Sequence, residues 1–134
     1  MKPVAETRIR VRYAETDQMG VVYYANYLVW MEVGRVELCK VCGFDYRDME
    51  REGVLMAVVE ANCRYASPAR FDDEVVIRAW VEEAHPRRIT FGYEMLTGGR
   101  TLATGHTRHV LVDRQFHRTR LPEKYYAMFG LEGE

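Results

Sequence analysis

The sequence predicts an α+β fold in which an antiparallel β-sheet curls around one long, largely buried helix. Three observations lead to this prediction: an alternating stretch near the N-terminus, one long helical segment that is mostly apolar, and four strand-like segments in succession. The chain has 134 residues, of which 48% are hydrophobic and 29% charged, so it is large enough to bury one core. No repeat or linker divides it, and we expect a single domain spanning residues 1–134.

The first two predicted elements are a strand and the long helix. Over residues 7–13, Ile9 and Val11 alternate with arginines, which is the period of a strand. From residue 24 to residue 42 the pattern is helical, and Gly43 can end the helix because glycine readily adopts a left-handed conformation. Charged residues cover only part of this helix, so we expect it to be mostly buried.

Strands dominate the rest of the chain. Residues 45–52 form a short polar helix or turn, and strands follow at 54–65, 74–83, 88–96 and 101–112, with turn signals between them. Two of these strands carry an apolar residue at every second position, which places those side chains on one face: Val75, Ile77, Ala79 and Val81, then Ile89, Phe91, Tyr93 and Met95. Consecutive strands of this kind can pair as antiparallel neighbours. Pro122 is expected at the first position of a final amphipathic helical turn.

Charge and cysteine content restrict the function classes. A net charge of −1 gives no general attraction to nucleic acid or to an anionic membrane. No apolar run approaches the roughly 18 residues of a membrane span, and the first residues lack the apolar core of a signal peptide. Cys39, Cys42 and Cys63 cannot all pair, so we expect the reducing cytoplasm. We expect no metal site, since His106 and His109 would face opposite sides of a strand.

The loop between the first strand and the long helix is the best candidate for a site. Asp17 lies in this loop three residues before Gly20, and the start of a helix leaves backbone N–H groups without helical partners. A carboxylate beside such donors suits attack on a carbonyl carbon, because the N–H groups stabilise the oxygen as it becomes negative. A turn or helix-capping aspartate is the structural alternative for Asp17.

The loop and its flanks closely resemble the signature of the hotdog-fold acyl-CoA thioesterases, in the branch of the 4-hydroxybenzoyl-CoA and Tol–Pal-associated (YbgC-type) enzymes. The matching residues are Tyr13, Glu15-Thr16-Asp17, Gly20, Val21-Val22, Tyr23-Tyr24, Asn26-Tyr27, and Glu32 with Arg35. Similar stretches follow at residues 65–73, 90–94 and 104–107, so the resemblance covers nearly the whole chain. It implies the hotdog fold and the hydrolysis of an acyl-CoA thioester to a carboxylic acid and free coenzyme A.

The resemblance also implies roles for individual residues. Asp17 matches the catalytic aspartate, which acts as a base toward water or as a nucleophile, and Gly20 belongs to the same loop. The backbone N–H of Tyr24 matches the donor that polarises the thioester carbonyl. Arg87 and Arg88 match a stretch that contacts coenzyme A in relatives, and the basic tract 114–120 is a second candidate. Further substrate contacts are expected from Thr16, Val22, Tyr23, Asn26 and Tyr27, with core packing as the alternative for Tyr23 and Tyr27. No cofactor is required because a thioester is already activated, and coenzyme A enters as part of the substrate.

Several alternatives stay open at this point. Some hotdog thioesterases use a helical glutamate, and Glu32 could serve, although we favour an i, i+3 ion pair between Glu32 and Arg35. A hydratase or dehydratase would need an acid–histidine pair, and no histidine follows Asp17 in the loop. A non-catalytic acyl-CoA-binding or protein-interaction domain is the third alternative. The open edge of one sheet predicts a homodimer or a homotetramer, and the resemblance places active sites between subunits.

Overall fold

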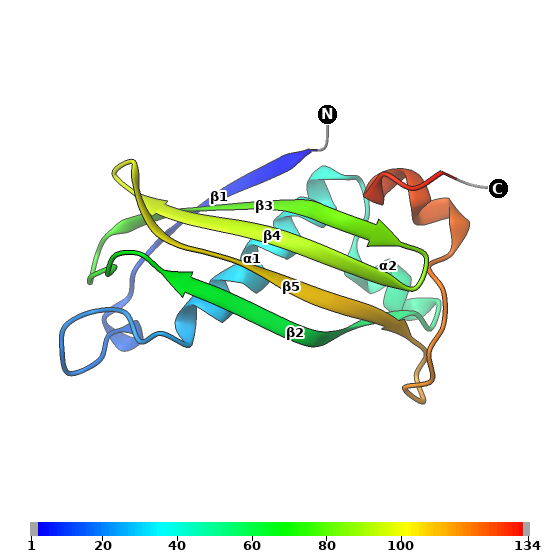
Figure 1. The fold of residues 1–134 in the computed structure, drawn as a ribbon, viewed down its shortest axis with the longest axis horizontal. Helices are drawn as coiled ribbons and strands as arrows, with labels where there is room; N and C mark the ends of the chain where they lie inside the picture. Colours follow the sequence, from blue (N-terminus) through cyan, green and yellow to red (C-terminus); the bar gives the residue numbers. More distant parts are fainter. Residues whose placement is uncertain (1–2, 133–134) are drawn as a thin grey trace.

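The computed structural model describes residues 3–132, in which a five-stranded antiparallel sheet wraps around one long helix (Figure 1). The elements in chain order are β1 (Val4–Arg10), η1 (Tyr13–Glu15), α1 (Asn26–Val41), α2 (Tyr46–Arg51), β2 (Leu55–Tyr65), β3 (Glu74–His85), β4 (Arg88–Thr97), β5 (Arg100–Val112) and η2 (Glu123–Phe129). The predicted α+β fold is therefore confirmed. The strand order is β1-β3-β4-β5-β2, so β2 pairs with β5 and is not a neighbour of β3.

The core lies between the inner face of the sheet and one side of α1. The two predicted apolar faces of β3 and β4 are buried as expected. The side of α1 that faces them carries Tyr27, Trp30, Met31, Gly34, Leu38 and Cys39, all of them buried. Gly34 allows the close approach, because a Cβ atom there would lie 2.8 Å from Cγ2 of Ile77 on β3. The helix is thus held tightly against β3, which fixes where its N-terminal end points.

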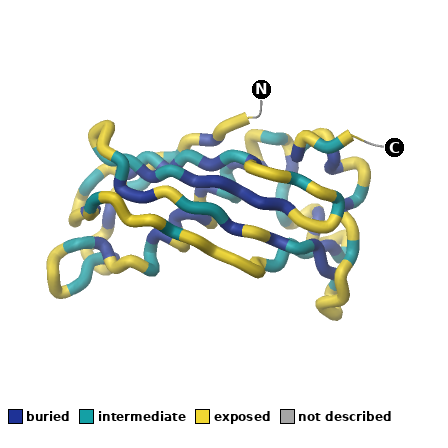
Figure 2. The backbone as a smooth tube through the Cα atoms, viewed as in Figure 1, coloured by how far each residue is buried: buried dark blue, intermediate teal, exposed yellow. Residues whose placement is uncertain are grey.

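The other side of α1 is apolar but exposed, so the prediction of a mostly buried helix is wrong for this face. Leu28 is 42% exposed, Val29 54% and Val33 38%. The edge strand β2 is exposed over much of its length as well, with Val58 and Val59 more than half accessible, as Figure 2 shows for the strand as a whole. An open sheet edge therefore accompanies an uncovered apolar helix face.

Three predicted boundaries are corrected. The first strand was expected at residues 7–13 but ends at Arg10. It cannot continue, because η1 begins at Tyr13 and the Glu15 side chain in η1 accepts the N–H of Arg12. Helix α1 begins at Asn26, two residues after the predicted start, because residues 24 and 25 form a turn. Pro122 precedes the first residue of η2 in an extended conformation (φ −60°, ψ 140°) and is not its first helical residue. Gly43 follows α1 with φ +93°, as predicted.

Candidate active site

The Asp17 loop is anchored by the neighbouring Glu15, whose side chain is buried. One carboxylate oxygen of Glu15 accepts the backbone N–H of Arg12 (2.8 Å), and the other accepts the indole N–H of Trp30 (3.0 Å). Burial alone would raise the pKa of this carboxyl. The two hydrogen bonds and the positive charge of Arg12 outweigh the burial, so the pKa is lowered and Glu15 stays ionised. Glu15 is therefore an ionised structural anchor that has no free oxygen for chemistry.

The backbone of Glu15 closes the loop at its other end. Its carbonyl oxygen accepts the N–H of Tyr23 (2.8 Å) and the side-chain amide of Asn26 (2.9 Å). The hydroxyl of Thr16 similarly donates to the carbonyl of Tyr13 (2.7 Å). Two residues expected to contact substrate, Thr16 and Asn26, thus use their polar side chains to hold the loop in shape.

Asp17 has one engaged and one free carboxylate oxygen. Its Oδ1 accepts the N–H of Met19 (2.8 Å), and its carbonyl accepts the N–H of Gly20 (2.9 Å), which has φ +78°. The structural alternative of a turn aspartate is therefore realised in part. Oδ2 has no partner among the described residues, so the turn orients the side chain and leaves one oxygen available.

The turn before α1 presents unpartnered donors. The N–H groups of Tyr24 and Ala25 meet no acceptor among the described residues, while the N–H groups of Asn26 and Leu28 bond back into the turn. The N–H groups at the start of a helix point away from its body, and Tyr24 and Ala25 directly precede Asn26, the first residue of α1. The sequence predicted that the N–H of Tyr24 polarises the thioester carbonyl, and that role stays a prediction.

An aromatic hollow of about 310 Å³ adjoins these donors. It is lined by Val21, Val22, Tyr24, Tyr27, Tyr65, Ala66, Ser67 and Pro68. The rings of Tyr27 and Tyr65 meet edge to face at 5.1 Å, and the ring of Tyr23 lies tilted against that of Tyr24 at 4.6 Å. Two residues expected at the substrate, Val22 and Tyr27, do line the hollow, whereas Tyr23 lies on the exposed surface. Tyr27 is also 3% exposed, so it serves the core as well.

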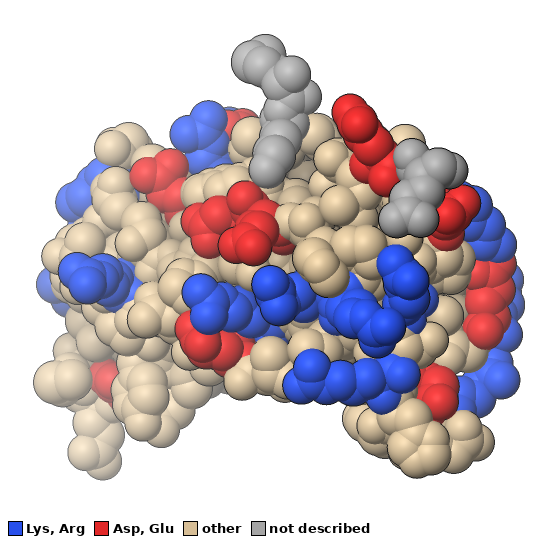
Figure 3. All heavy atoms as spheres, turned by 45° about the vertical axis from the view of Figure 1, so that its right-hand side comes forward, with Lys and Arg blue, Asp and Glu red and all other residues tan. Residues whose placement is uncertain are grey.

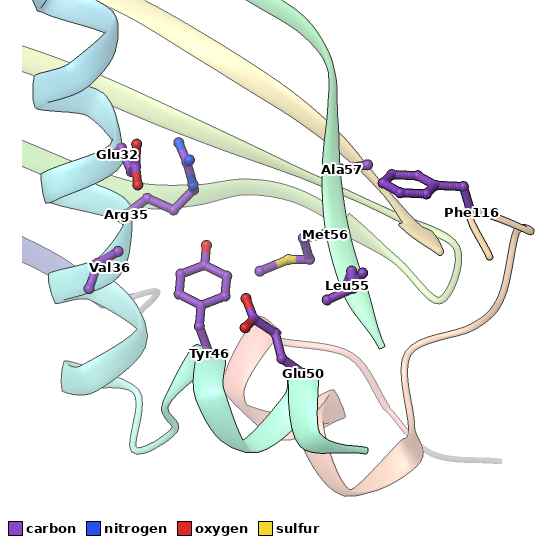
Figure 4. A pocket seen from close by; sticks show the side chains of 9 residues that line it. All are labelled: Glu32, Arg35, Val36, Tyr46, Glu50, Leu55, Met56, Ala57 and Phe116. Carbon is purple, nitrogen blue, oxygen red and sulfur yellow. The ribbon is translucent and has the colours of Figure 1, made fainter. Parts of the chain in front are cut away.

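A second hollow, of about 470 Å³, lies beside the middle of α1 (Figure 4). Arg35 projects into it from α1 and Tyr46 from α2. The expected ion pair between Glu32 and Arg35 is not found among the described residues, so that prediction is wrong. The Arg35 guanidinium instead donates to the hydroxyl of Tyr93 on β4 (3.2 Å), which draws it into the interior, and Glu32 stays at the exposed rim.

Behind Arg35 a buried polar chain crosses the sheet. The Tyr93 hydroxyl bonds to Thr107 (2.6 Å), and Thr107 bonds to Nε2 of His109 (2.8 Å). Burial and the nearby Arg35 charge lower the pKa of His109 to about 4, so this imidazole is neutral near pH 7. His106 lies on the outer face beside Glu60, which confirms that the two histidines point to opposite sides.

Arg87 and Arg88 lie at the opposite end of the sheet from Asp17. They follow β3, whose start lies next to the Asp17 loop and whose 12 residues span about 35–40 Å. Both arginines are exposed, and neither has an ion pair within the described residues.

The N–H of Leu111 donates to the Arg87 carbonyl (3.2 Å), and the N–H of Leu121 donates to the Pro86 carbonyl (2.7 Å). The end of the basic tract 114–120 therefore lies beside this hairpin, with Arg120 near Pro86, on a side of the molecule where Figure 3 shows many basic side chains. One chain does not bring the arginines to the Asp17 loop.

Other features bear on the remaining expectations. Cys39, Cys42 and Cys63 are free thiols. Within residues 3–132, no cluster of three or more His, Cys, Asp or Glu side chains could hold a metal ion. In the same range no helix has the length and apolar character required to cross a bilayer.

The fold and the Asp17 loop place this chain in a known class of protein. Residues 11–129 match the model of the thioesterase-like superfamily, and the chain belongs to that superfamily. Its sequence is 45% identical to YneP of Bacillus subtilis, which carries the provisional name of acyl-CoA thioesterase, over 84% of this chain and 82% of that one. It is 30% identical to the acyl-CoA thioester hydrolase YbgC of Escherichia coli O6:H1, over 70% of each chain.

Solved structures agree with this membership. The DHNA-CoA thioesterase of Staphylococcus aureus superimposes with a TM-score of 0.88 at 33% identity, covering 95% of this chain and 86% of that one. The hypothetical protein TT1821 of Thermus thermophilus has a TM-score of 0.89 at 38% identity, over 98% of this chain and 100% of that one. The hotdog fold implied by the sequence is therefore confirmed.

The sequence did not indicate that Glu15 and Tyr65 hold the Asp17 loop and the following turn in place. Glu15 was noticed as part of the motif, but its role depends on Trp30, 15 residues away on the helix. Tyr65, whose hydroxyl donates to the carbonyl of Tyr24 (2.9 Å), is 41 residues away on another element. No local pattern connects such partners, although the aromatic residue at the end of a strand was a usable signal for Tyr65.

Proposed function

We propose that this protein is an acyl-CoA thioester hydrolase that uses Asp17 and the backbone N–H of Tyr24. The observation that carries the proposal is the free Oδ2 of Asp17 in a loop beside an unpartnered helix-start N–H and an aromatic hollow. Membership of the superfamily, with relatives named acyl-CoA thioesterases, supports the same activity. The acyl group would enter next to Tyr24, with Val22 and Tyr27 as walls and Gly20 giving the loop its turn.

The reaction needs few groups because a thioester is reactive and a thiolate leaves easily. Asp17 either takes a proton from water, which attacks the carbonyl carbon, or attacks that carbon itself to give an anhydride that water then hydrolyses. In both routes the carbonyl oxygen becomes negative, and the Tyr24 N–H stabilises it by roughly 3 kcal/mol. The C–S bond then breaks with departure of the coenzyme A thiolate. Under this proposal no metal or other cofactor takes part.

The same proposal includes a second copy of the chain. The phosphates of coenzyme A suit Arg87 and Arg88, since guanidinium groups bind phosphate oxygens in pairs. These arginines and Asp17 stand at opposite ends of one sheet, so a single substrate can use both only if the arginines come from a partner subunit. The exposed apolar face of α1 and the open edge of β2 offer a surface for that partner. We therefore propose a homodimer, or a homotetramer of such dimers.

The free thiols suit a reducing compartment, so we propose the cytoplasm as the site of action. A hydratase or dehydratase is less well supported, because it needs a histidine beside the catalytic acid. His109 is committed to Thr107 in the core, and the other three histidines lie outside the Asp17 loop. A binding domain without catalysis would share the hollow and the arginines but would not need the free oxygen of Asp17.

The test is release of free thiol from short, long and aromatic acyl-CoAs by wild type, Asp17→Asn and Glu32→Gln. Asp17→Asn keeps an oxygen for the N–H of Met19 but cannot act as base or nucleophile, so kcat should fall at least about 100-fold. Glu32→Gln alters an exposed carboxylate at the second hollow, and its kcat should stay within about 3-fold of wild type.

Two results would contradict the proposal. Wild type that binds acyl-CoAs but hydrolyses none would favour the binding domain. A strong loss in Glu32→Gln with little loss in Asp17→Asn would move the catalytic carboxylate to the helix. Circular dichroism and thermal unfolding of each variant separate lost chemistry from lost structure.

A further inference from the structure

The turn that carries the free donors is fixed at three points, each on a different peptide group. The N–H of Tyr23 donates to the carbonyl of Glu15 (2.8 Å), and the carbonyl of Tyr23 accepts the N–H of Asn26 (2.9 Å). The third contact comes from β2, where the hydroxyl of Tyr65 donates to the carbonyl of Tyr24 (2.9 Å). The alternative partner of that carbonyl within the turn, the N–H of Tyr27, is longer at 3.4 Å. Tyr65 is therefore the stronger partner of the Tyr24 carbonyl.

The peptide group that Tyr65 holds also carries the N–H of Ala25. A trans peptide is planar, with its C=O and N–H pointing in opposite directions, so fixing the carbonyl of Tyr24 fixes the direction of the Ala25 N–H. A donor on the carbonyl also polarises that N–H, because hydrogen bonds in series strengthen one another. Ala25 has helical dihedral angles (φ −69°, ψ −21°), so its N–H points off the end of α1. It has no acceptor among the described residues.

We propose that Tyr65 is a positioning residue, which aims the N–H of Ala25 so that it joins the N–H of Tyr24 in a two-donor oxyanion site. This inference rests on the proposed thioester hydrolysis and adds both a second donor and the residue that directs it. Tetrahedral oxyanions in acyl transfer are commonly held by two donors, and adjacent N–H groups at a helix start supply such a pair. Tyr65 also lines the hollow beside Tyr24, so its hydroxyl acts at the wall of the substrate site.

The surroundings of Tyr65 suit a permanent donor. Tyr65 is about half exposed, and its partial burial and the nearby Cys63 thiol raise its pKa to about 12, so the hydroxyl keeps its proton across the pH range of an assay. The ring packs edge to face on Tyr27 (5.1 Å) and near Tyr24 (6.5 Å). Tyr65→Phe keeps these ring contacts and removes only the donor, which makes the substitution specific for the proposed role.

The experiment compares kcat and KM for an acyl-CoA that wild type hydrolyses, using Tyr65→Phe and the control Tyr13→Phe. Tyr13 is 76% exposed, and its ring meets Phe71 at 5.5 Å, outside the proposed donor site. Tyr65→Phe should lower kcat about 10-fold with KM changed less than about 2-fold, because an oxyanion donor acts in the transition state. Tyr13→Phe should match wild type. Thermal unfolding should show both variants folded.

A backbone variant tests the donor itself. Replacing Ala25 by lactic acid through nonsense suppression exchanges its N–H for an ester oxygen and keeps the side chain. This variant should lose about 30- to 100-fold in kcat, and Tyr65→Phe should add less than about 2-fold on top of it, because both changes act on one donor. If the role of Tyr65 were purely structural, the two fold-losses in kcat would be independent and would multiply.

Every outcome of these experiments either supports or overturns the proposed role of Tyr65. The inference is overturned if Tyr65→Phe keeps kcat within about 2-fold of wild type, if the ester variant does so, or if the two losses multiply. An inactive wild type, or an active Asp17→Asn, overturns the proposed function as well. The inference alone is wrong if wild type is active, Asp17→Asn is inactive and Tyr65→Phe is unaffected.

Discussion

Two carboxylates two residues apart, Glu15 and Asp17, have different surroundings, because Glu15 is the last residue of η1 and Asp17 starts the turn that ends at Gly20. Glu15 turns inward to Trp30 and is 7% exposed, whereas Asp17 faces outward with one oxygen free. The sequence placed Asp17 correctly in a loop before a helix, since both the loop and the helix are local patterns. The inward direction of Glu15 depends on a partner on another element, and no local pattern reports such a contact.

The stabilisation supplied by Glu15 should depend on pH. Its pKa lies below the ordinary value of 4.5, so the carboxylate stabilises the fold above about pH 4.5, and this contribution is lost as the pH falls through the folded-state pKa. Glu15→Gln keeps an oxygen acceptor but no charge, and should cost about 1–2 kcal/mol of unfolding free energy at neutral pH. Urea unfolding from about pH 7 to about pH 3 should show the gap between wild type and variant narrowing on acidification. A constant gap would contradict this assignment.

Element boundaries and faces were predictable to different degrees. The buried face of β4 followed from its own alternation, because each side chain's direction is set by its neighbours in sequence. The pairing of β2 with β5 was not predictable in this way, since it joins segments separated by β3 and β4. The long helix was recognised, but part of its apolar surface, with Leu28, Val29 and Val33, is uncovered in one chain. A local sequence pattern shows which face of a helix or strand is apolar, but it does not show which element or subunit packs against that face.

Gly105 on β5 shows how closely the paired strands approach. A Cβ atom at this position would lie 2.1 Å from the backbone oxygen of Asn62 on β2 and 2.6 Å from the Met31 side chain of α1. Gly105→Ala should therefore force β2 away from β5 and reduce the free energy of unfolding by about 3 kcal/mol. The matched control is Thr104→Ala, an exposed neighbour on the same strand, which should change stability by less than about 0.5 kcal/mol. Equal denaturation midpoints for both variants would show that the strands can separate without cost.

At the scale of the whole molecule, the site proposed for one substrate is divided between two ends of the sheet. The loop with Asp17 adjoins the start of β3, and Arg87 follows its other end. Within residues 3–132, no element covers the exposed apolar side of α1 or the exposed edge strand β2. The sequence suggested both sets of residues but contained no distance between them. Because the two sets of residues lie far apart in one chain, the proposed chemistry requires the predicted oligomer.

Subunit mixing tests that requirement directly. Asp17→Asn should lack chemistry, and the double variant Arg87→Ser with Arg88→Ser should bind coenzyme A esters at least about 10-fold more weakly, because two phosphate-binding charges are lost. In a mixed dimer with shared sites, one site keeps both Asp17 and the arginines, and the other has neither. Co-refolding the two variants at equal concentration should therefore restore about one quarter of wild-type kcat/KM, since half of the dimers are mixed and each has one intact site. If every site were built within one chain, no mixed dimer would contain an intact site, and activity would stay at the mean of the two separate variants.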